Sequence, residues 1–268
     1  MLGNGAGFGA ADRTLGTEYD MNQISLDGKV ILVTGAARSI GAGMADEFAS
    51  AGATVIRTDV DDSADGVQRL DVTREDDWKA VVDEVVAEHG RLDGLVNNAA
   101  LVYRCAPMWE EPLEEFESML AVNVKGVWLG LQTASKAMAS TGGGSIVNLS
   151  STSGVMAARL FSGYGVTRWA VRGMSKHAAH GLAEHSIRVN SVHPHGIAGS
   201  GMVEKFLPTD PDQQRAVREA AATRNPLGRQ GTIADVSSMV AYLLSDLSTW
   251  ITGREFVVDG GATLTAAQ

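Results

Sequence analysis

The chain has 268 residues, is 44% hydrophobic and carries a formal net charge of −10. This length and apolar content predict a single compact domain, and the negative charge argues against nucleic acid and anionic membranes as partners. The one cysteine, Cys105, cannot form an internal disulfide and stands in no cluster with metal-site spacing. We therefore expect no metal and a reducing, cytoplasmic environment.

The first 25 residues differ from the rest of the chain. They are rich in glycine and alanine, and they lack the basic start and the continuous apolar run of a signal peptide. No later stretch is long and apolar enough to span a bilayer. We predict a flexible arm over residues 1–25 and a folded domain over residues 26–268.

From Lys29 onward, short β-branched runs alternate with amphipathic segments of helix length. This pattern predicts an α/β fold, a doubly wound parallel sheet with helices on both faces. The expected strands are Val30–Thr34, Thr54–Thr58, Gly94–Asn97, Ser145–Leu149, Arg188–Val192 and Glu255–Val258. The expected helices are Ile40–Ser50, Arg74–His89, Leu113–Ser140, Gly163–Glu184 and Ile233–Leu244.

Residues 196–228 break this alternation with glycine, proline and a mixed polar helix. A segment of that length in a compact domain is typical of a lid or a binding loop. We predict that it covers a substrate site.

A turn of small residues follows the first expected strand and opens a helix, with the sequence Thr34-Gly35-Ala36-Ala37-Arg38-Ser39-Ile40-Gly41. Small residues let the backbone approach a pyrophosphate, and the helix behind them presents unpaired N–H groups and a positive dipole end. A glycine-rich turn taken alone fits an ordinary tight turn equally well. The residues further along the chain decide between the two interpretations.

Asp59 stands at the end of the second expected strand, where a carboxylate can accept both ribose hydroxyls of an adenosine. A solvated turn aspartate is the alternative. If Asp59 faces the ribose, it repels a 2′-phosphate by on the order of 1 kcal/mol in water. The sequence therefore favours NAD over NADP, although Arg57 and Arg38 could contact a 2′-phosphate and argue mildly for NADP.

Five separated motifs occur in one order along the chain. They are Thr34–Gly41, Asp71-Val72, Asn97-Asn98-Ala99-Ala100, Ser151 with Tyr164, and Val257-Val258-Asp259-Gly260-Gly261. In this respect the chain resembles the short-chain dehydrogenase/reductase family from Lys29 to Gly261. The resemblance implies a Rossmann-like sheet of about seven strands, an NAD(P) cofactor, and homodimers or homotetramers built through the two long central helices.

The resemblance also assigns site residues. The implied catalytic residues are Asn123, Ser151, Tyr164 and Arg168. The implied cofactor-binding residues are Thr34, Gly35, Arg38, Ser39, Ile40, Gly41, Asp59, Asp71, Val72, Asn98, Ala99, Tyr164, Arg168, Pro194 and Ile197, and Asn97 maps to the same side.

The chemistry of hydride transfer requires a proton to leave or reach the alcohol oxygen in step with the hydride. Tyr164 is a weak base at neutral pH unless a nearby cation favours its phenolate. Arg168, four residues later, shares its helix face, and Ser151 could donate to the same substrate oxygen. A packed helix tyrosine would be the ordinary interpretation without the serine and the cofactor turn.

The family has lysine where this chain has Arg168. Arginine keeps the positive charge and can still bond ribose hydroxyls, but it does not readily give up a proton. The Ser-Tyr-Arg set also resembles halohydrin dehalogenases, which suggests a redox-neutral lyase as one alternative. A catalytically weak cofactor-binding homologue is another. Retention of the cofactor turn, Asp59 and Asp71 favours the dehydrogenase.

Two further departures concern the cofactor turn and the end of the sixth expected strand. Ser39 replaces the middle glycine of the turn, where it could bond a phosphate, cap the helix or crowd the pyrophosphate. Ala100 replaces the last glycine of its motif. His195 is an extra residue beside Pro194, and it is either a substrate-orienting group or a solvent-facing loop histidine.

The specificity surface is expected from residues 101–109, 154–161 and the lid. Its apolar side chains are Met108, Trp109, Val155, Met156, Leu160, Phe161, Met202 and Phe206. An apolar pocket suits a medium-sized secondary alcohol or ketone, apolar or cyclic, better than a sugar phosphate or a polyanion. The alternative is that these side chains simply pack the lid onto the body of the protein.

Overall fold

The computed structural model describes residues 24–103, 106–201 and 207–264. Within these residues, seven strands form one fully parallel sheet in the order β3-β2-β1-β4-β5-β6-β7. The strands are β1 (Val30–Thr34), β2 (Thr54–Asp59), β3 (Val67–Arg69), β4 (Gly94–Asn97), β5 (Gly144–Leu149), β6 (Ile187–Pro194) and β7 (Glu255–Val258).

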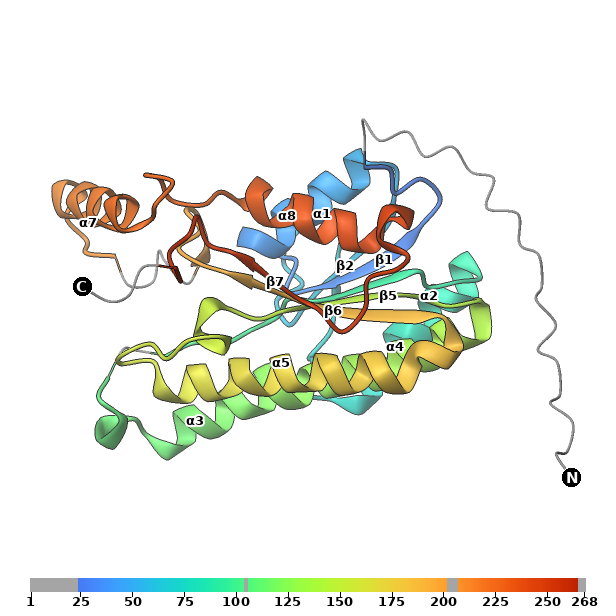
Figure 1. Cartoon of the computed structure of the whole chain (residues 1–268). Helices are drawn as coiled ribbons and strands as arrows, with labels where there is room; N and C mark the ends of the chain where they lie inside the picture. The colour runs from blue at the N-terminus through green and yellow to red at the C-terminus, as the bar shows by residue number, and fades with distance from the viewer. Residues whose placement is uncertain (1–23, 104–105, 202–206, 265–268) are drawn as a thin grey trace, which may run out of the picture.

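Helices cover both faces of the sheet, with α1 and α8 on one side and α2, α4 and α5 on the other (Figure 1). Their bounds are α1 (Ser39–Ser50), α2 (Glu75–His89), α3 (Leu113–Leu120), α4 (Gly126–Thr141), α5 (Ser162–Leu182), α7 (Pro211–Arg224) and α8 (Ile233–Leu244). This arrangement confirms the predicted doubly wound α/β fold with about seven strands.

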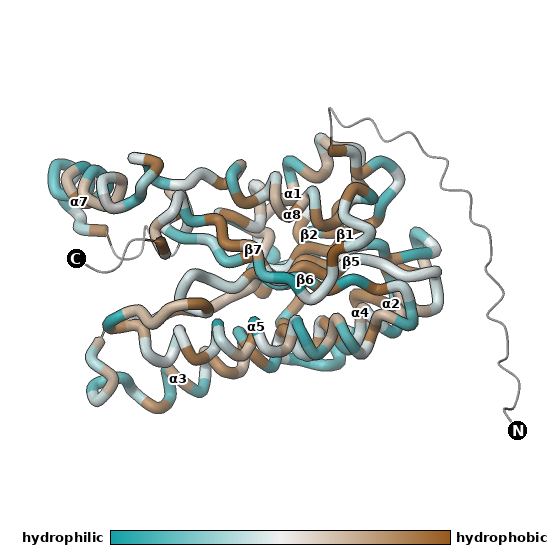
Figure 2. Tube along the Cα trace, in the orientation of Figure 1, coloured by the Kyte–Doolittle hydropathy of each residue, from teal (hydrophilic) through white to brown (hydrophobic). Residues whose placement is uncertain are grey.

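Strand β1 explains how the sheet builds two cores. Successive side chains point to opposite faces of a strand, so Val30 and Leu32 pack among the side chains of α2, α4 and α5. Ile31 and Val33 pack on the other face, against α1 and α8. Because both faces are covered, all five β1 residues are buried, and the first four form a continuous apolar run that ends at Thr34. The central strands accordingly carry the most hydrophobic part of the chain (Figure 2).

Two elements differ from the sequence-based expectation. Strand β3 was not predicted, because its three residues are only partly buried or exposed and show no alternation. The helix expected over residues 113–140 is divided into α3 and α4 by a π-helical turn, Ala121–Lys125. A π turn inserts an extra residue without changing the apolar character of the segment, so a 3.6-residue pattern does not reveal it.

The predicted lid contains helix α7, which lies beyond the body of the sheet in Figure 1. Asp210 caps this helix by accepting a hydrogen bond from the backbone N–H of Gln213, and Pro211 occupies its first turn. Of the predicted arm, only Ile24 and Ser25 are described, and Ile24 packs against the core. Cys105, Met202 and Phe206 lie outside the described residues.

Candidate active site

The crevice between β1 and β4 is where the strand order reverses, because the chain moves outward from β1 to β2 and β3 and then returns to β4. Ligands of open α/β sheets bind at such a crevice, outside the carboxyl ends of the strands. Here the turns after β1 and β4 touch. Gly35 has a φ of +68°, and a Cβ on it would lie 2.9 Å from Cα of Ala99. A Cβ on Gly41 would overlap the carbonyl oxygen of Gly35.

Thr34 and Asn98 hold these two turns together. The Thr34 hydroxyl oxygen accepts hydrogen bonds from the backbone N–H groups of Asn98 and Ala99, each at 3.0 Å. The side-chain amide of Asn98 donates back to the carbonyl oxygens of Thr34 (2.8 Å) and Gly35 (3.1 Å). The structure thus brings together five of the cofactor-binding residues predicted from the sequence, directly before the N-terminus of α1, where an anion is stabilised.

Asp59 lies beside the same turn. Its carboxylate accepts hydrogen bonds from the backbone N–H of Ala37 (3.1 Å) and of Asp61 (3.2 Å). Arg57 points to α1 and pairs with Asp46 at 2.6 Å. Arg38 is largely exposed, and its guanidinium lies 3.8 Å from the carboxylate of Asp61. Acidic partners therefore face both arginines that could otherwise receive a 2′-phosphate.

Asp71 and Val72 follow β3 and the residue Leu70. Burial opposes ionisation of Asp71, but hydrogen bonds from the backbone N–H and hydroxyl of Thr73 outweigh it and lower the pKa of this carboxyl. Val72 is buried against α4, where a Cβ on Gly126 would lie 2.9 Å from its methyl group. Both residues stand at the carboxyl edge, on the β2–β3 side of the crevice.

Ser39 has a left-handed backbone conformation, with a φ of +59° that favours glycine. Its hydroxyl accepts a hydrogen bond from the backbone N–H of Gly201 at 2.8 Å and lies 3.4 Å from the carbonyl oxygen of Gly199. The side chain therefore connects the cofactor turn to the start of the predicted lid. The backbone N-cap of α1 is the neighbouring Arg38, without a side-chain cap.

Ser151 follows β5 and precedes a short 3-10 turn, residues 152–154. Its hydroxyl oxygen accepts a hydrogen bond from the backbone N–H of Ser153 at 3.1 Å. The segment packs closely on α5. The Ser150 hydroxyl donates to the carbonyl oxygen of Arg168 at 3.1 Å, and a Cβ on Gly154 would lie 2.8 Å from that oxygen. The glycine thus lets the serine segment lie directly against the helix.

Tyr164 and Arg168 are both buried on α5, at 5% and 1% exposure. The guanidinium carbon lies 4.6 Å from the centre of the tyrosine ring, and Nη1 donates to the carbonyl oxygen of Leu149 at 3.2 Å. Nε and Nη2 of Arg168 are buried without a partner among the described residues. A buried charged donor without an acceptor is costly, so this guanidinium fits a ligand that supplies acceptor oxygens, such as a ribose.

Asn123 occupies the π-helical turn and is fully buried. Its amide donates to the carbonyl oxygen of Leu101 (2.8 Å) and to the hydroxyl of Thr167 (3.1 Å), and its oxygen accepts from the backbone N–H of Leu101 (2.7 Å). The Thr167 hydroxyl in turn donates to the carbonyl oxygen of Tyr164 at 2.7 Å. Asn123 therefore joins the loop after β4 to the part of α5 that carries Tyr164.

The side chains of two other residues predicted on the cofactor side are buried in the core, and a third residue is partly buried. The Asn97 side chain is buried and donates to Asn148 at 2.8 Å, so it belongs to a core network. The Ile197 side chain is also in the core, next to Gly231, which leaves its main chain as the part that can face a cofactor. Pro194 ends β6 and is partly buried.

Sequence reasoning missed two groups at the site. The Glu111 carboxylate accepts a hydrogen bond from the backbone N–H of Gly163 at 2.9 Å, at the N-terminus of α5, and no sequence signal marked it. His193 is fully buried, with Nδ1 at 3.0 Å from the carbonyl oxygen of Ser151. His195 is exposed, with Nδ1 at 3.0 Å from the Thr152 hydroxyl. The pair of histidines around Pro194 is the signal that could have drawn attention to His193.

The loops around Tyr164 carry apolar side chains. Met108 and Trp109 are 71% and 86% exposed, and Met156 and Leu160 are about 40% exposed. The backbone N–H of Ala106 donates to the carbonyl oxygen of Leu160, which joins the two loops. Within the described residues there is no cluster of metal-ligating side chains, and no helix has the length and apolar character needed to cross a bilayer.

Comparisons with known proteins agree with this geometry. A family model described as enoyl-(acyl carrier protein) reductase matches residues 35–263. The chain is 38% identical over 247 residues to a 3-alpha-(or 20-beta)-hydroxysteroid dehydrogenase of Mycobacterium tuberculosis, covering 88% of this chain and 90% of the relative. It is 36% identical over 251 residues to a cyclopentanol dehydrogenase of Comamonas testosteroni, covering 88% and 97%. The crystal structure of levodione reductase matches with a TM-score of 0.84 at 27% identity, covering 90% and 99%.

Proposed function

The chain belongs to the short-chain dehydrogenase/reductase family and is an oxidoreductase acting on CH–OH groups, and we propose that it interconverts secondary alcohols and ketones with NAD. The observation that carries the proposal is the buried pair of Tyr164 and the partly unsatisfied Arg168. A nicotinamide cofactor, when bound, accepts the hydride from the alcohol carbon or returns it to the ketone.

The side chains of this protein would manage the proton and the orientation of the substrate. Tyr164 takes the hydroxyl proton of the alcohol, or gives it back, as the general base or acid. Arg168 keeps a positive charge against the tyrosine ring and offers Nε and Nη2 to ribose oxygens. The Ser151 hydroxyl donates to the substrate oxygen, and Asn123 fixes the turn of α5 behind Tyr164.

The preference for NAD is supported by the charges around the turn after β1. The Asp59 carboxylate is held at the backbone N–H of Ala37, close to the expected position of the adenosine ribose. A 2′-phosphate brought there meets like charge, while Arg57 is occupied by Asp46. These contacts favour two free ribose hydroxyls.

An apolar or cyclic substrate is supported by the two joined loops that precede α3 and α5, the second of which leads directly to Tyr164. Their exposed apolar side chains, including Met108, Trp109 and Met156, offer hydrophobic contact and few charges. The similar proteins are named for hydroxysteroids and cyclopentanol, both of which are cyclic alcohols. The redox-neutral dehalogenase and the catalytically weak homologue gain no support from these relatives, which are dehydrogenases.

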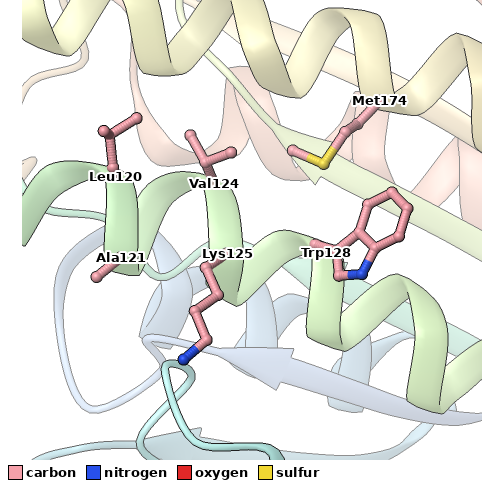
Figure 3. A pocket seen from close by; sticks show the side chains of 6 residues that line it. All are labelled: Leu120, Ala121, Val124, Lys125, Trp128 and Met174. Carbon is pink, nitrogen blue, oxygen red and sulfur yellow. The ribbon is translucent and has the colours of Figure 1, made fainter. Parts of the chain in front are cut away.

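A homodimer or homotetramer is supported by an apolar groove of about 500 Å³. Figure 3 shows Leu120, Val124, Trp128 and Met174 around it, contributed by the α3–α4 region and by α5. Trp128 is 58% exposed, and an apolar surface of this kind is suited to a second copy of the chain. Sedimentation equilibrium tests the assembly: we expect Trp128→Glu to shift it to smaller species, and an unchanged mass would exclude this surface as the interface.

A cytoplasmic location is supported by the single cysteine and the acidic composition. Fractionation of cells that express the full chain tests it, with recovery in an extracytoplasmic fraction as the contradicting result.

Calorimetric titration of the purified protein with NAD and, separately, NADP tests the proposed cofactor before any substrate is known. We expect NAD to bind measurably more tightly than NADP. Binding of neither nucleotide would contradict the proposed function, and tighter binding of NADP would contradict the role of Asp59.

A further inference from the structure

The main-chain pairing of β5 with β6 ends just before the proposed catalytic serine. The last hydrogen bond of this ladder runs from the backbone N–H of Ser150 to the carbonyl oxygen of Val192 at 2.7 Å. The next two residues, Ser151 and Thr152, are instead bound by the side chains of His193 and His195.

The alternation of a strand explains why both histidines reach the same neighbour. Residues two apart point to the same side of an extended chain, and Pro194 between them points to the other. The extended path continues past β6, because the backbone N–H of His195 donates to the carbonyl oxygen of Val258 at 3.0 Å. An extra histidine after Pro194 therefore places a second imidazole beside the first.

The hydrogen bonds fix the tautomer of His193. A carbonyl oxygen can only accept, so Nδ1 must carry the proton that is donated to Ser151, at 3.0 Å. Nε2 of the neutral ring is then an acceptor for the Ser191 hydroxyl at 2.9 Å. The ring is fully buried and Ser191 is 1% exposed, so the orientation of the imidazole is closely defined.

The carbonyl oxygen of Ser151 accepts two hydrogen bonds, one for each of its lone pairs. It accepts one hydrogen bond from His193 and a second from the backbone N–H of Gly154 at 2.8 Å. The Ser151 hydroxyl oxygen accepts from Ser153 in the same turn. Removing the imidazole would leave a lone pair of this partly buried carbonyl group without its donor, at the residue whose hydroxyl must point to the substrate.

We propose that His193 and His195 form a clamp that positions Ser151. His193 binds the backbone carbonyl group of Ser151, and His195 binds the hydroxyl group of the next residue, Thr152. The clamp acts through Ser151 and Thr152, so the two histidines are positioning residues. This inference rests on the proposed catalytic role of Ser151.

The test compares His193→Asn with His193→Leu, because the asparagine amide nitrogen can occupy the place of Nδ1 and donate to the same carbonyl group, whereas leucine cannot. Thr152→Val removes the bond to His195 at constant shape, and provides a second variant if leucine at position 193 fails to fold. His180→Leu, on the exposed side of α5, is the matched control. The measurements are kcat with a cyclic secondary alcohol, NAD affinity by calorimetry, and amide hydrogen exchange of residues 151–156.

We expect His193→Leu to lower kcat by about tenfold or more through misplacement of the serine, with NAD affinity unchanged and faster exchange in residues 151–156. His193→Asn should retain most of the wild-type kcat and the slow hydrogen exchange of residues 151–156. Thr152→Val should give a kcat and an exchange rate between those of the two His193 variants. Wild-type kcat and exchange in both His193→Leu and Thr152→Val, or equal losses in the asparagine and leucine variants, would overturn the clamp. If the wild-type protein turns over no alcohol, the proposed function fails, and the exchange measurement alone then decides for or against the clamp.

Discussion

The guanidinium group of Arg168 lies against the ring of Tyr164, with its carbon 4.6 Å from the ring centre, one turn further along α5. Only one of its nitrogens, Nη1, has a hydrogen-bond acceptor among the described residues, the carbonyl oxygen of Leu149. The buried guanidinium therefore keeps two donor nitrogens, Nε and Nη2, for a ligand. In the proposed function, Arg168 supplies the positive charge at the position where the family pattern implies a lysine.

Two substitutions of Arg168 test separately how its positive charge and its side-chain shape contribute to turnover. Arg168→Lys keeps the positive charge, so we expect dehydrogenase turnover at or above the wild-type value. Arg168→Met removes the charge at similar volume, and we expect kcat to fall by roughly 10²-fold, within the range ascribed to acid–base assistance. Steady-state kinetics with a saturating alcohol measure both. Equal turnover in the methionine variant and the wild-type protein would exclude a role for the cation.

Asp59→Asn tests the charge at the adenosine end. Removing the negative charge beside the turn should improve NADP binding by about tenfold, corresponding to roughly 1.4 kcal/mol of relieved repulsion. NAD binding should change less, because the amide still accepts a hydrogen bond from one ribose hydroxyl. The dissociation constants come from calorimetry, with Asp83→Asn on the outer face of α2 as the control. An unaltered ratio of the two constants would refute the assignment.

The effects of the Ser39 β-carbon and of its hydroxyl group on cofactor binding can be tested separately. The φ of +59° disfavours any side chain, and the hydroxyl binds the backbone of Gly201. We expect Ser39→Gly to bind NAD several-fold more tightly, because glycine removes the β-carbon from the turn that would receive the pyrophosphate. Relief of the strained φ should separately raise the free energy of unfolding by about 1 kcal/mol. Ser39→Ala keeps the β-carbon and loses the lid contact. Weaker NAD binding in the glycine variant would show that the lid contact is worth more than the relief of crowding.

The stability of the protein should depend on pH through His193. Burial lowers the pKa of His193, and the ring is neutral in the folded state. As the pH falls below about 6.5, the unfolded chain binds a proton that the folded chain does not, so the free energy of unfolding decreases by up to about 1.4 kcal/mol per pH unit. The charged groups around this histidine are Glu255, Arg172 and Lys176, and both cations pair with the Glu255 carboxylate.

Urea unfolding between about pH 7 and pH 5 measures this slope. His193→Asn has no titrating ring, so its slope should be smaller than that of the wild-type protein. Partial desolvation of the His195 ring by its neighbours also lowers the pKa of His195, which acts in the same direction and leaves a residual slope. Identical slopes in the two proteins would contradict the buried neutral histidine.

The strands that are buried on both faces could be predicted closely from the sequence. The bounds of β1 and β4, which are buried along their whole length, agree residue for residue, since apolar runs between turn residues leave little choice of where the strand ends. The bounds of β7 agree as well, although that edge strand is partly exposed. Strand β3 and the π-helical turn around Asn123 could not be predicted. The first is too short to show a pattern, and the second depends on Asn123 finding partners in Leu101 and Thr167, which are far away in the sequence.

The residues of the candidate site that belong to a family motif could be predicted from the sequence. Contacts that depend on how β5 and β6 pair could not. Residue types marked Tyr164 and Arg168, and the structure brings them into contact. The bond from His193 to Ser151 joins residues 42 apart, and it exists because Leu149 of β5 pairs with Val192 of β6. No single-chain pattern reports which residues lie side by side at the ends of two such strands.

The proton-transfer role of Tyr164 is the centre of this account, and its most direct test is the formation of NADH from NAD and a cyclic secondary alcohol by the wild-type protein and by Tyr164→Phe. We predict turnover by the wild-type protein and a loss of at least about 10²-fold in the phenylalanine variant, with NAD affinity retained. Undiminished alcohol oxidation by Tyr164→Phe would contradict the mechanism.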